Sequence, residues 1–354
     1  MPTELKAGKI VYNMEKSSKS QFFTLLPDGK LRCEVCPQHC RLNDGQRGFC
    51  YVRQRQGDRI VLTCYGMPSG LSVDPIEKKP LYHFLPGSSV LSFGTVGCNL
   101  ACRFCQNWNL VRMRNFETTS RLVLPQQIAD TAEQSNCISV AFTYNEPTIF
   151  IEYAIDCAAL CRERNIKTVA VTNGYISNVA AQELYDHIDA ANVDLKAFND
   201  NFYKKLCSGS LQPVLDTLVY LVHKTKVWVE ITNLIIPGEN DDRSELEKMT
   251  TWIVKELGPD IPIHFSAFYP AYRMQNHSST THAALEQARE IALAAGTKYV
   301  YLGNTHDQEG MKTYCHGCRE TVIERKGHVL TSLLLSSEGV CKNCGSVIPG
   351  VFSN

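Results

Sequence analysis

The sequence lacks the features that mark membrane, secreted and disordered proteins. It contains no run of about 18 apolar residues, so we expect no membrane-spanning segment. Its first residues, MPTELKAGKIVYNMEK, include no apolar stretch like that of a secretory leader. Lys and Arg together number 36, as do Asp and Glu, and this zero net charge gives no support for a nucleic-acid partner. Hydrophobic residues make up 44% of the chain, which excludes a largely disordered protein.

The unusual part of the composition is the 16 cysteines. Most of them fall in three tight groups, near the N-terminus, near residue 100 and near the C-terminus. Disulfides seldom join cysteines two residues apart, whereas a metal ion or cluster needs several thiolates that converge on one point. In a long chain without a leader, this pattern favours a reducing cytoplasm and as many as three metal sites.

Hydrophobic periodicity divides the chain into a cysteine-rich N-terminal part (1–87), a regular middle part (88–303) and a short, zinc-ribbon-like C-terminal part (304–354). In the middle part, short apolar runs that predict buried strands alternate with segments of helical period. Such alternation requires parallel strands joined by crossovers, and six or more units favour an α/β partial barrel with its chemistry at the carboxyl ends of the strands. The predicted strands are 90–96, 138–143, 167–172, 192–197, 227–235, 261–267 and 298–303, and the predicted helices are 148–164, 177–188, 211–225, 243–257 and 282–295.

Three cysteines with the spacing C-x3-C-x2-C directly follow the first predicted barrel strand: Cys98, Cys102 and Cys105. Three thiolates on one loop can hold three irons of a [4Fe–4S] cluster and leave the fourth iron open for a small chelating molecule. The residues alone leave two alternatives, which are three zinc ligands completed by a remote group, or three unrelated core cysteines.

This segment resembles the signature of the radical S-adenosylmethionine (SAM) superfamily, C-x3-C-x-aromatic-C, with Phe104 as the aromatic residue. The resemblance implies a partial (β/α)6 barrel and a [4Fe–4S] cluster whose unique iron binds the amino and carboxylate groups of SAM. It also implies reductive cleavage of SAM to methionine and a 5′-deoxyadenosyl radical, which abstracts a hydrogen atom from the substrate. No catalytic residue beyond the cluster is assigned.

Segments after the later strands resemble the activating enzymes of glycyl-radical enzymes, such as pyruvate formate-lyase activating enzyme. Thr143–Pro147 stands in the place of a Gly-Gly-Glu-Pro segment, which implies that Glu146 receives the methionine ammonium group, although Tyr144 and Asn145 replace the glycines. The residues alone also allow Glu146-Pro147 to be simply the start of a helix.

The same resemblance places four more residues around SAM. They are Asn173 in a T-N-G segment, Asp194 and Lys196 in a D-L-K segment, and His264, whose counterpart approaches the ribose. The residues alone also allow purely structural roles, because Asp194 and Lys196 could form an ion pair inside the barrel and His264 could be a satisfied core residue.

The flanking cysteine groups predict two further metal sites. Two C-x2-C pairs near the C-terminus are typical of a zinc ribbon, with a single iron ion as the alternative. The N-terminal group predicts a closed site for zinc or for a second iron–sulfur cluster that relays electrons, and His39 could replace one thiolate. The C-terminal ligands are Cys315, Cys318, Cys341 and Cys344, the N-terminal ligands are Cys33, Cys36, Cys40 and Cys50, and we interpret Cys64, Cys137, Cys157, Cys161 and Cys207 as core residues.

The combination of both flanking groups with the central motif resembles the AmmeMemoRadiSam-type radical SAM proteins. This resemblance implies an electron donor such as flavodoxin or ferredoxin, and AMMECR- or Memo-type proteins as partners. By analogy with the activating enzymes we expect a protein substrate. Modification of RNA or of a small molecule, and a non-enzymatic metal-binding scaffold, remain alternatives.

Overall fold

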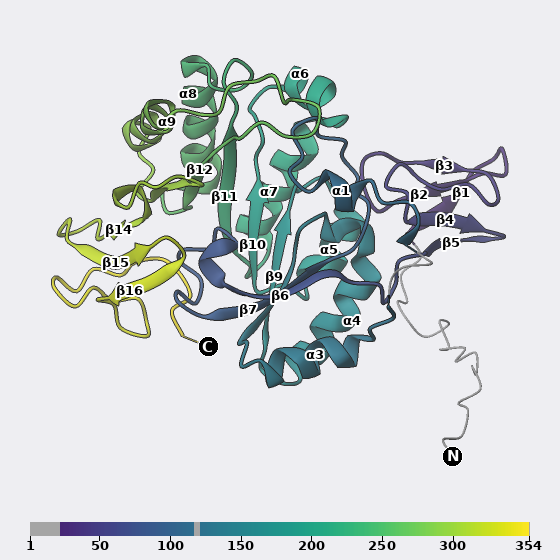
Figure 1. Ribbon diagram of the computed structural model, residues 1–354, viewed down its shortest axis with the longest axis horizontal. Helices are drawn as coiled ribbons and strands as arrows, with labels where there is room; N and C mark the ends of the chain where they lie inside the picture. Colours follow the sequence, from purple (N-terminus) through teal and green to yellow (C-terminus); the bar gives the residue numbers. More distant parts are fainter. Residues whose placement is uncertain (1–21, 117–120, 354) are drawn as a thin grey trace.

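The computed structural model of the chain describes residues 22–116 and 121–353, and an eight-stranded sheet lies at its centre (Figure 1). One edge strand, β6 (Ser69–Pro75), pairs antiparallel with β7 (Ser89–Gly94), and the other strands run parallel in sequence order. The two edge strands, β6 and β13, do not pair with each other within the described residues, so the sheet is an open, partial barrel, which confirms the predicted fold class. The remaining strands are β8 (Ser139–Phe142), β9 (Lys167–Thr172), β10 (Ala190–Asp194), β11 (Trp228–Ile235), β12 (Ile263–Ala267) and β13 (Val300–Gly303).

Helices join the parallel strands, and each of the predicted helical segments contains one. A further helix, α3 (Pro125–Gln134), was missed by the periodicity. It begins with Pro125 in its first turn, and Gln127 Oε1 accepts a hydrogen bond of 2.8 Å from the Leu124 backbone N–H. The other helices are α4 (Ile151–Arg162), α5 (Asn178–Tyr185), α7 (Gln212–Lys224), α8 (Arg243–Trp252), extended by a π-helical turn at Ile253–Leu257, and α9 (His282–Ala294).

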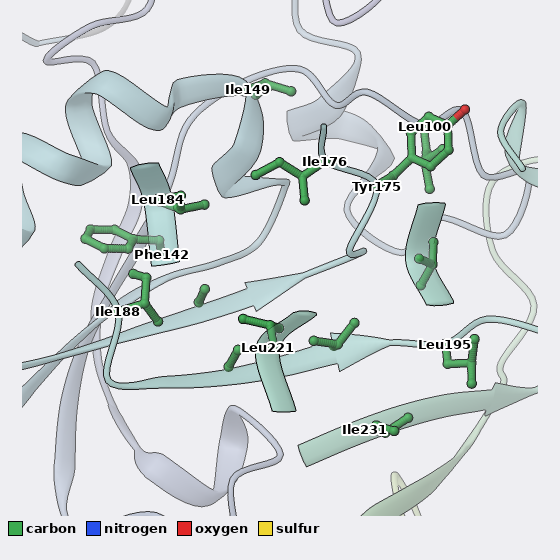
Figure 2. Packing of buried hydrophobic residues seen from close by; sticks show 14 of the residues in the cluster. Leu100, Phe142, Ile149, Tyr175, Ile176, Leu184, Ile188, Leu195, Leu221 and Ile231 are labelled. Atoms are coloured by element: carbon green, nitrogen blue, oxygen red, sulfur yellow. The ribbon is translucent and has the colours of Figure 1, made fainter. Parts of the chain in front are cut away.

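The core lies between the sheet and these helices. Figure 2 shows part of it, with Phe142, Leu184 and Leu221 packed beside the strands and Leu100 and Tyr175 at the far end. Leu100 belongs to the loop that carries the central cysteines and is 2% exposed. The loop is therefore anchored in the core rather than resting on the surface. No helix of the described residues has the length and apolar character to cross a membrane.

The segment 76–85 covers the sheet near the amino ends of its strands. Ile76, Leu81 and Phe84 are buried and pack in one cluster with strand residues such as Val90 and Ala190. Both strand residues lie at or near the start of their strands. The segment therefore fills one end of the partial barrel, and the carboxyl ends of the strands form the other end.

The C-terminal unit, formed by β14 (Thr313–Tyr314), β15 (Thr321–Lys326) and β16 (Val329–Leu333), is joined to the segment 76–85 by one buried cation. The Arg325 side chain is fully buried, its Nη2 donates to Tyr82 O at 2.6 Å, and its guanidinium lies 4.1 Å from the centre of the Tyr82 ring. Its Nε is 3.7 Å from Glu77 Oε1. The unit is thus part of the closure at the amino ends of the strands.

The N-terminal unit lies on the opposite side of the molecule from the C-terminal unit (Figure 1). Arg53 connects it to the barrel, because its buried Nη1 donates to Glu152 Oε1 of α4 at 2.9 Å. The boundary at residue 87 stays a prediction, although β6, from the predicted N-terminal part, belongs to the central sheet. The unit consists of β1 (Phe23–Leu25), β2 (Leu31–Cys33) and β3 (Arg41–Leu42) in one small sheet, and β4 (Arg53–Gln56) and β5 (Arg59–Leu62) in another.

Candidate functional site

The three central cysteines lie on the loop that follows β7, at the carboxyl edge of the sheet. All three are partly buried free thiols. Hydrogen bonds from neighbouring loops fix the backbone between and before them: Asn145 Nδ2 donates to Val96 O at 3.3 Å and to Gly97 O at 3.1 Å. Ala101 N donates to Cys207 O and Arg103 N to Leu206 O, both at 2.8 Å. These hydrogen bonds give the loop a defined shape.

Glu146 lies after β8 and is fully buried. Its Oε1 accepts hydrogen bonds from Thr148 N at 3.0 Å, Thr148 Oγ1 at 2.6 Å and Thr172 Oγ1 at 2.8 Å. Its Oε2 accepts one bond, from Asn173 N at 2.7 Å. Burial raises the pKa of Glu146, and these hydrogen bonds oppose that shift. The carboxylate is held in place with acceptor capacity left on Oε2.

Asn173, after β9, connects Glu146 to the cysteine loop. Its Nδ2 lies 3.7 Å from Cys98 Sγ and donates to Asn99 Oδ1 at 2.9 Å. Burial and then the nearby Glu146 raise the pKa of Cys98 well above its ordinary value. The structure therefore brings together three of the residues predicted from sequence, Cys98, Glu146 and Asn173.

Asp194 and Lys196 form an ion pair, with Lys196 Nζ 2.8 Å from Asp194 Oδ2. The predicted strand 192–197 placed Lys196 within the strand. This was wrong, because β10 ends at Asp194 and Lys196 lies in the loop beyond it. Burial lowers the pKa of Lys196, but Asp194 and Cys102 raise it well above its ordinary value. Lys196 Nζ also lies 6.0 Å from the centre of the buried Phe104 ring. The pair thus faces the cysteine loop from a third strand end.

His264 lies among buried polar groups. In the sheet register it is level with Thr232 and, through Thr232, with Asp194. Its Nε2 is 2.6 Å from Glu230 Oε2, and the Tyr82 ring packs edge-on against it at 4.8 Å. The histidine is therefore a satisfied buried residue, covered by the segment 76–85, and its approach to a ribose stays a prediction.

The spacing of the sulfur atoms helps to distinguish a site for a single metal ion from a site for an iron–sulfur cluster. One zinc ion holds its sulfur ligands about 3.8 Å apart, because Zn–S bonds measure about 2.3 Å. In a [4Fe–4S] cluster each cysteine binds a different iron, so the sulfurs are further apart. Among the described residues, three or more ligand atoms within 4.8 Å of one another occur in the C-terminal cysteines and in a partly exposed group of His282, Glu286 and Asp307. The central and N-terminal cysteines do not meet this spacing. Of the three cysteine groups, the C-terminal one therefore meets the spacing of a single ion.

The four C-terminal cysteines come from two turns of the C-terminal unit. Cys315 Sγ lies 3.5 Å from Cys344 Sγ, and Cys318 Sγ lies 3.9 Å from Cys341 Sγ. These distances are close to those expected around one tetrahedral ion. The group can hold a single metal ion, as its sequence spacing predicts.

Several residues that shape the site were not found from sequence. Tyr144 adopts φ = 67°, a left-handed conformation that glycine tolerates better. Its phenol hydroxyl donates a hydrogen bond to Asp74 Oδ2 at 3.0 Å. The tyrosine therefore keeps the backbone shape that a glycine would give. Asn145, the second departure from Gly-Gly-Glu-Pro, supports the cysteine loop. The only signal in the sequence is that both residues stand where glycine is expected.

The chain is similar in sequence to several known proteins. Residues 93–250 match the sequence model of the radical SAM superfamily. Uncharacterized protein MJ0808 of Methanocaldococcus jannaschii is 39% identical over 333 residues, which cover 93% of this chain and 98% of that protein. The pyruvate formate-lyase-activating enzyme of Clostridium pasteurianum is 27% identical over 165 residues, which cover 46% of this chain and 67% of the enzyme. The solved structure of Streptococcus suis SuiB bound to precursor peptide SuiA has 15% identity and a TM-score of 0.49, over 65% of this chain and 52% of SuiB.

Proposed function

The chain belongs to the radical SAM superfamily, and from this premise we propose that it is an enzyme that abstracts a hydrogen atom from a protein substrate. Cys98, Cys102 and Cys105 would hold the [4Fe–4S] cluster. When bound, cluster and SAM together supply one-electron cleavage of the sulfonium to methionine and a 5′-deoxyadenosyl radical. The observation that carries the proposal is that Asn173 contacts both Glu146 and Cys98, the first of these thiols, at one edge of the sheet.

The protein's own groups would bind and orient SAM. Glu146 Oε2 has capacity to accept a hydrogen bond from the methionine ammonium, while Oε1 is occupied by hydroxyl and backbone donors. Asn173 would keep this carboxylate and Cys98 in a fixed relation. The Asp194–Lys196 pair offers a cation and an anion to the polar groups of SAM. The segment 76–85 excludes water from the amino ends of the strands.

Similarity to the pyruvate formate-lyase-activating enzyme of Clostridium pasteurianum supports a protein substrate, because that enzyme is named for activating another enzyme. The T-N-G and D-L-K segments, which resemble those of glycyl-radical activating enzymes, point the same way. As finer proposals, we place the chain with the AmmeMemoRadiSam-type proteins, in the cytoplasm, with a flavodoxin- or ferredoxin-type electron donor and zinc in the C-terminal cysteine group. AMMECR- and Memo-type proteins are then candidate partners.

The test is anaerobic reconstitution with iron and sulfide, followed by incubation with SAM, a reductant and candidate protein partners. We expect 5′-deoxyadenosine release that increases with the true substrate, and a glycyl radical signal by electron paramagnetic resonance (EPR) on that partner. Absence of SAM cleavage in a chain with a full cluster would contradict the enzyme proposal and favour a metal-binding scaffold.

One surface feature favours RNA as the alternative substrate. The rings of Trp108, in the short helix α1 (Trp108–Val111) after the cysteine loop, and Tyr272 stack at 5.3 Å, and the Arg273 guanidinium lies 5.2 Å from the Tyr272 ring. Arg273 N also donates to Arg103 O on the cysteine loop, at 2.9 Å. Aromatic and arginine side chains together are a platform on which unpaired bases stack. Deoxyadenosine release that depends on added RNA would favour this alternative.

We expect Lys196→Ala to weaken SAM binding more than it affects cluster assembly. A hydrogen bond to a charged group contributes about 1.5–3 kcal/mol, so the Kd for SAM should rise about ten- to hundredfold. Equilibrium binding of SAM to the reconstituted variant measures the effect, and iron analysis checks the cluster. Lys204→Ala is the matched control, because Lys204 is exposed and pairs with Asp200 instead. An unchanged Kd in Lys196→Ala would exclude Lys196 from the SAM site.

A further inference from the structure

The four N-terminal cysteines converge although the unit around them is small. Cys33 ends β2, and its backbone N–H donates to Cys40 O at 2.9 Å. Phe49 N lies 3.2 Å from Cys40 Sγ. A Cβ atom placed on Gly48, two residues before Cys50, would lie 3.5 Å from Cys40 Sγ. The segment that carries Cys50 therefore packs against the turn that carries the other three cysteines.

These thiols do not have the features of disulfides or of a single-ion site. All four are free, and three of them are buried, with Cys40 partly exposed. The C-terminal cysteines meet the spacing of one ion, whereas the N-terminal four, which are also fully described, do not. Four cysteines are the full ligand set of a cubic cluster, in which each of the four irons binds one cysteine.

The N-terminal group lies directly against the central cysteine loop. A Cβ atom placed on Gly97, next to Cys98, would be 2.2 Å from Cys50 O, so only a glycine allows this approach. Gln38, between Cys36 and Cys40, donates through Nε2 to Asn99 O at 2.9 Å and to Ser208 O at 2.8 Å. The backbone of Cys50, a predicted ligand of the N-terminal group, therefore lies against Gly97, the residue before the central ligand Cys98.

We propose that Cys33, Cys36, Cys40 and Cys50 hold a second [4Fe–4S] cluster, which passes electrons to the cluster at the central cysteines. A cluster with four cysteine ligands has no open iron, which suits electron transfer and not SAM binding. The site itself follows from the four thiols, whereas its role as a relay rests on the proposed radical SAM function.

The electron balance of the relay is simple. One electron enters the second cluster from a low-potential one-electron donor protein and leaves for the central cluster, so the second cluster is unchanged after each transfer. The central cluster delivers that electron to SAM, whose sulfonium C–S bond breaks. The partly exposed Cys40 and the exposed Phe49 lie on the outer side of the N-terminal group, where a donor can approach.

The test compares the full chain with Cys36→Ser/Cys50→Ser after anaerobic reconstitution. We expect about eight irons per wild-type chain and about four in the variant. The EPR spectrum of reduced wild type should differ from the sum of single-cluster spectra, because neighbouring paramagnetic clusters couple. Cys64→Ala, a fully buried cysteine of the same unit, is the control and should keep all the iron.

The second set of readouts separates this inference from the proposed function. With dithionite the double variant should still cleave SAM, whereas with a flavodoxin or ferredoxin donor its activity should fall to the background without donor. If the double variant does not fold, Cys98→Ala/Cys102→Ala/Cys105→Ala should retain about four irons and an EPR-active cluster. About four irons in wild type, zinc at the N-terminal group, or unchanged donor-dependent activity in the double variant would overturn the inference. Eight irons without SAM cleavage would instead keep the site and refute the enzyme proposal.

Discussion

The triple variant Cys98→Ala/Cys102→Ala/Cys105→Ala is expected to release no 5′-deoxyadenosine above background. The remaining residues of the site, including Glu146 and Lys196, cannot supply an electron to SAM, so no partial activity should survive. The measurement is deoxyadenosine formation with excess dithionite, together with iron content and circular dichroism. We expect a loss of about four irons with the fold retained, because these side chains are only partly buried.

The matched control for this variant is Cys137→Ala. Cys137 is buried after α3 and lies in none of the three cysteine groups, so its replacement should keep both iron and activity. SAM cleavage by the triple variant would place the chemistry elsewhere in the chain. Equal loss of activity in Cys137→Ala would mean that the assay reports general instability and not the site.

The largest stability effect is expected for Arg325→Met. This change removes a buried cation from Glu77 and from Tyr82 O while keeping most of the side-chain volume. Breaking a buried pair from one side typically costs about 3–5 kcal/mol, because the partner charge stays buried without compensation. Urea unfolding should therefore give a free energy of unfolding lower by about that amount.

Two further variants test the origin of this effect. Lys326→Met changes an exposed neighbour on the same strand and should have little effect. In Arg325→Met/Glu77→Gln the buried negative charge is also removed, so part of the lost stability should return. A double variant as unstable as the sum of both single variants would show that Arg325 acts through Tyr82 and packing alone.

The strand pattern of the fold could be predicted because parallel strands buried on both faces are continuous apolar runs. Strand β6 was not predicted because its sequence, SGLSVDP, is largely polar. It is an edge strand and pairs antiparallel with β7. The segment 76–85 carries no periodicity, and its burial depends on tertiary packing against Val90 and Ala190. Its role in filling one end of the sheet therefore could not be read from local sequence.

The site could be predicted where chemistry demands a residue type at a fixed spacing. Three thiols on one loop and an acid after the next strand meet that condition, and the structure joins Cys98 to Glu146 through Asn173. The roles of Asn145 and Gln38 could not be predicted, because their contacts join segments that are far apart in sequence. A single sequence does not distinguish an amide side chain that makes such a contact from one that does not. The hydrogen bond between His264 and Glu230 could not be predicted either, because the two residues lie on different strands.

The packed segment 76–85 covers the amino ends of the strands. A nucleotide held at the opposite end would therefore enter and leave from the carboxyl side. A macromolecule seated on that opening would trap the nucleotide beneath it. If the substrate is a macromolecule, as proposed, we expect the nucleotide to bind first and the macromolecule second, so that excess macromolecule inhibits turnover by occupying the empty chain.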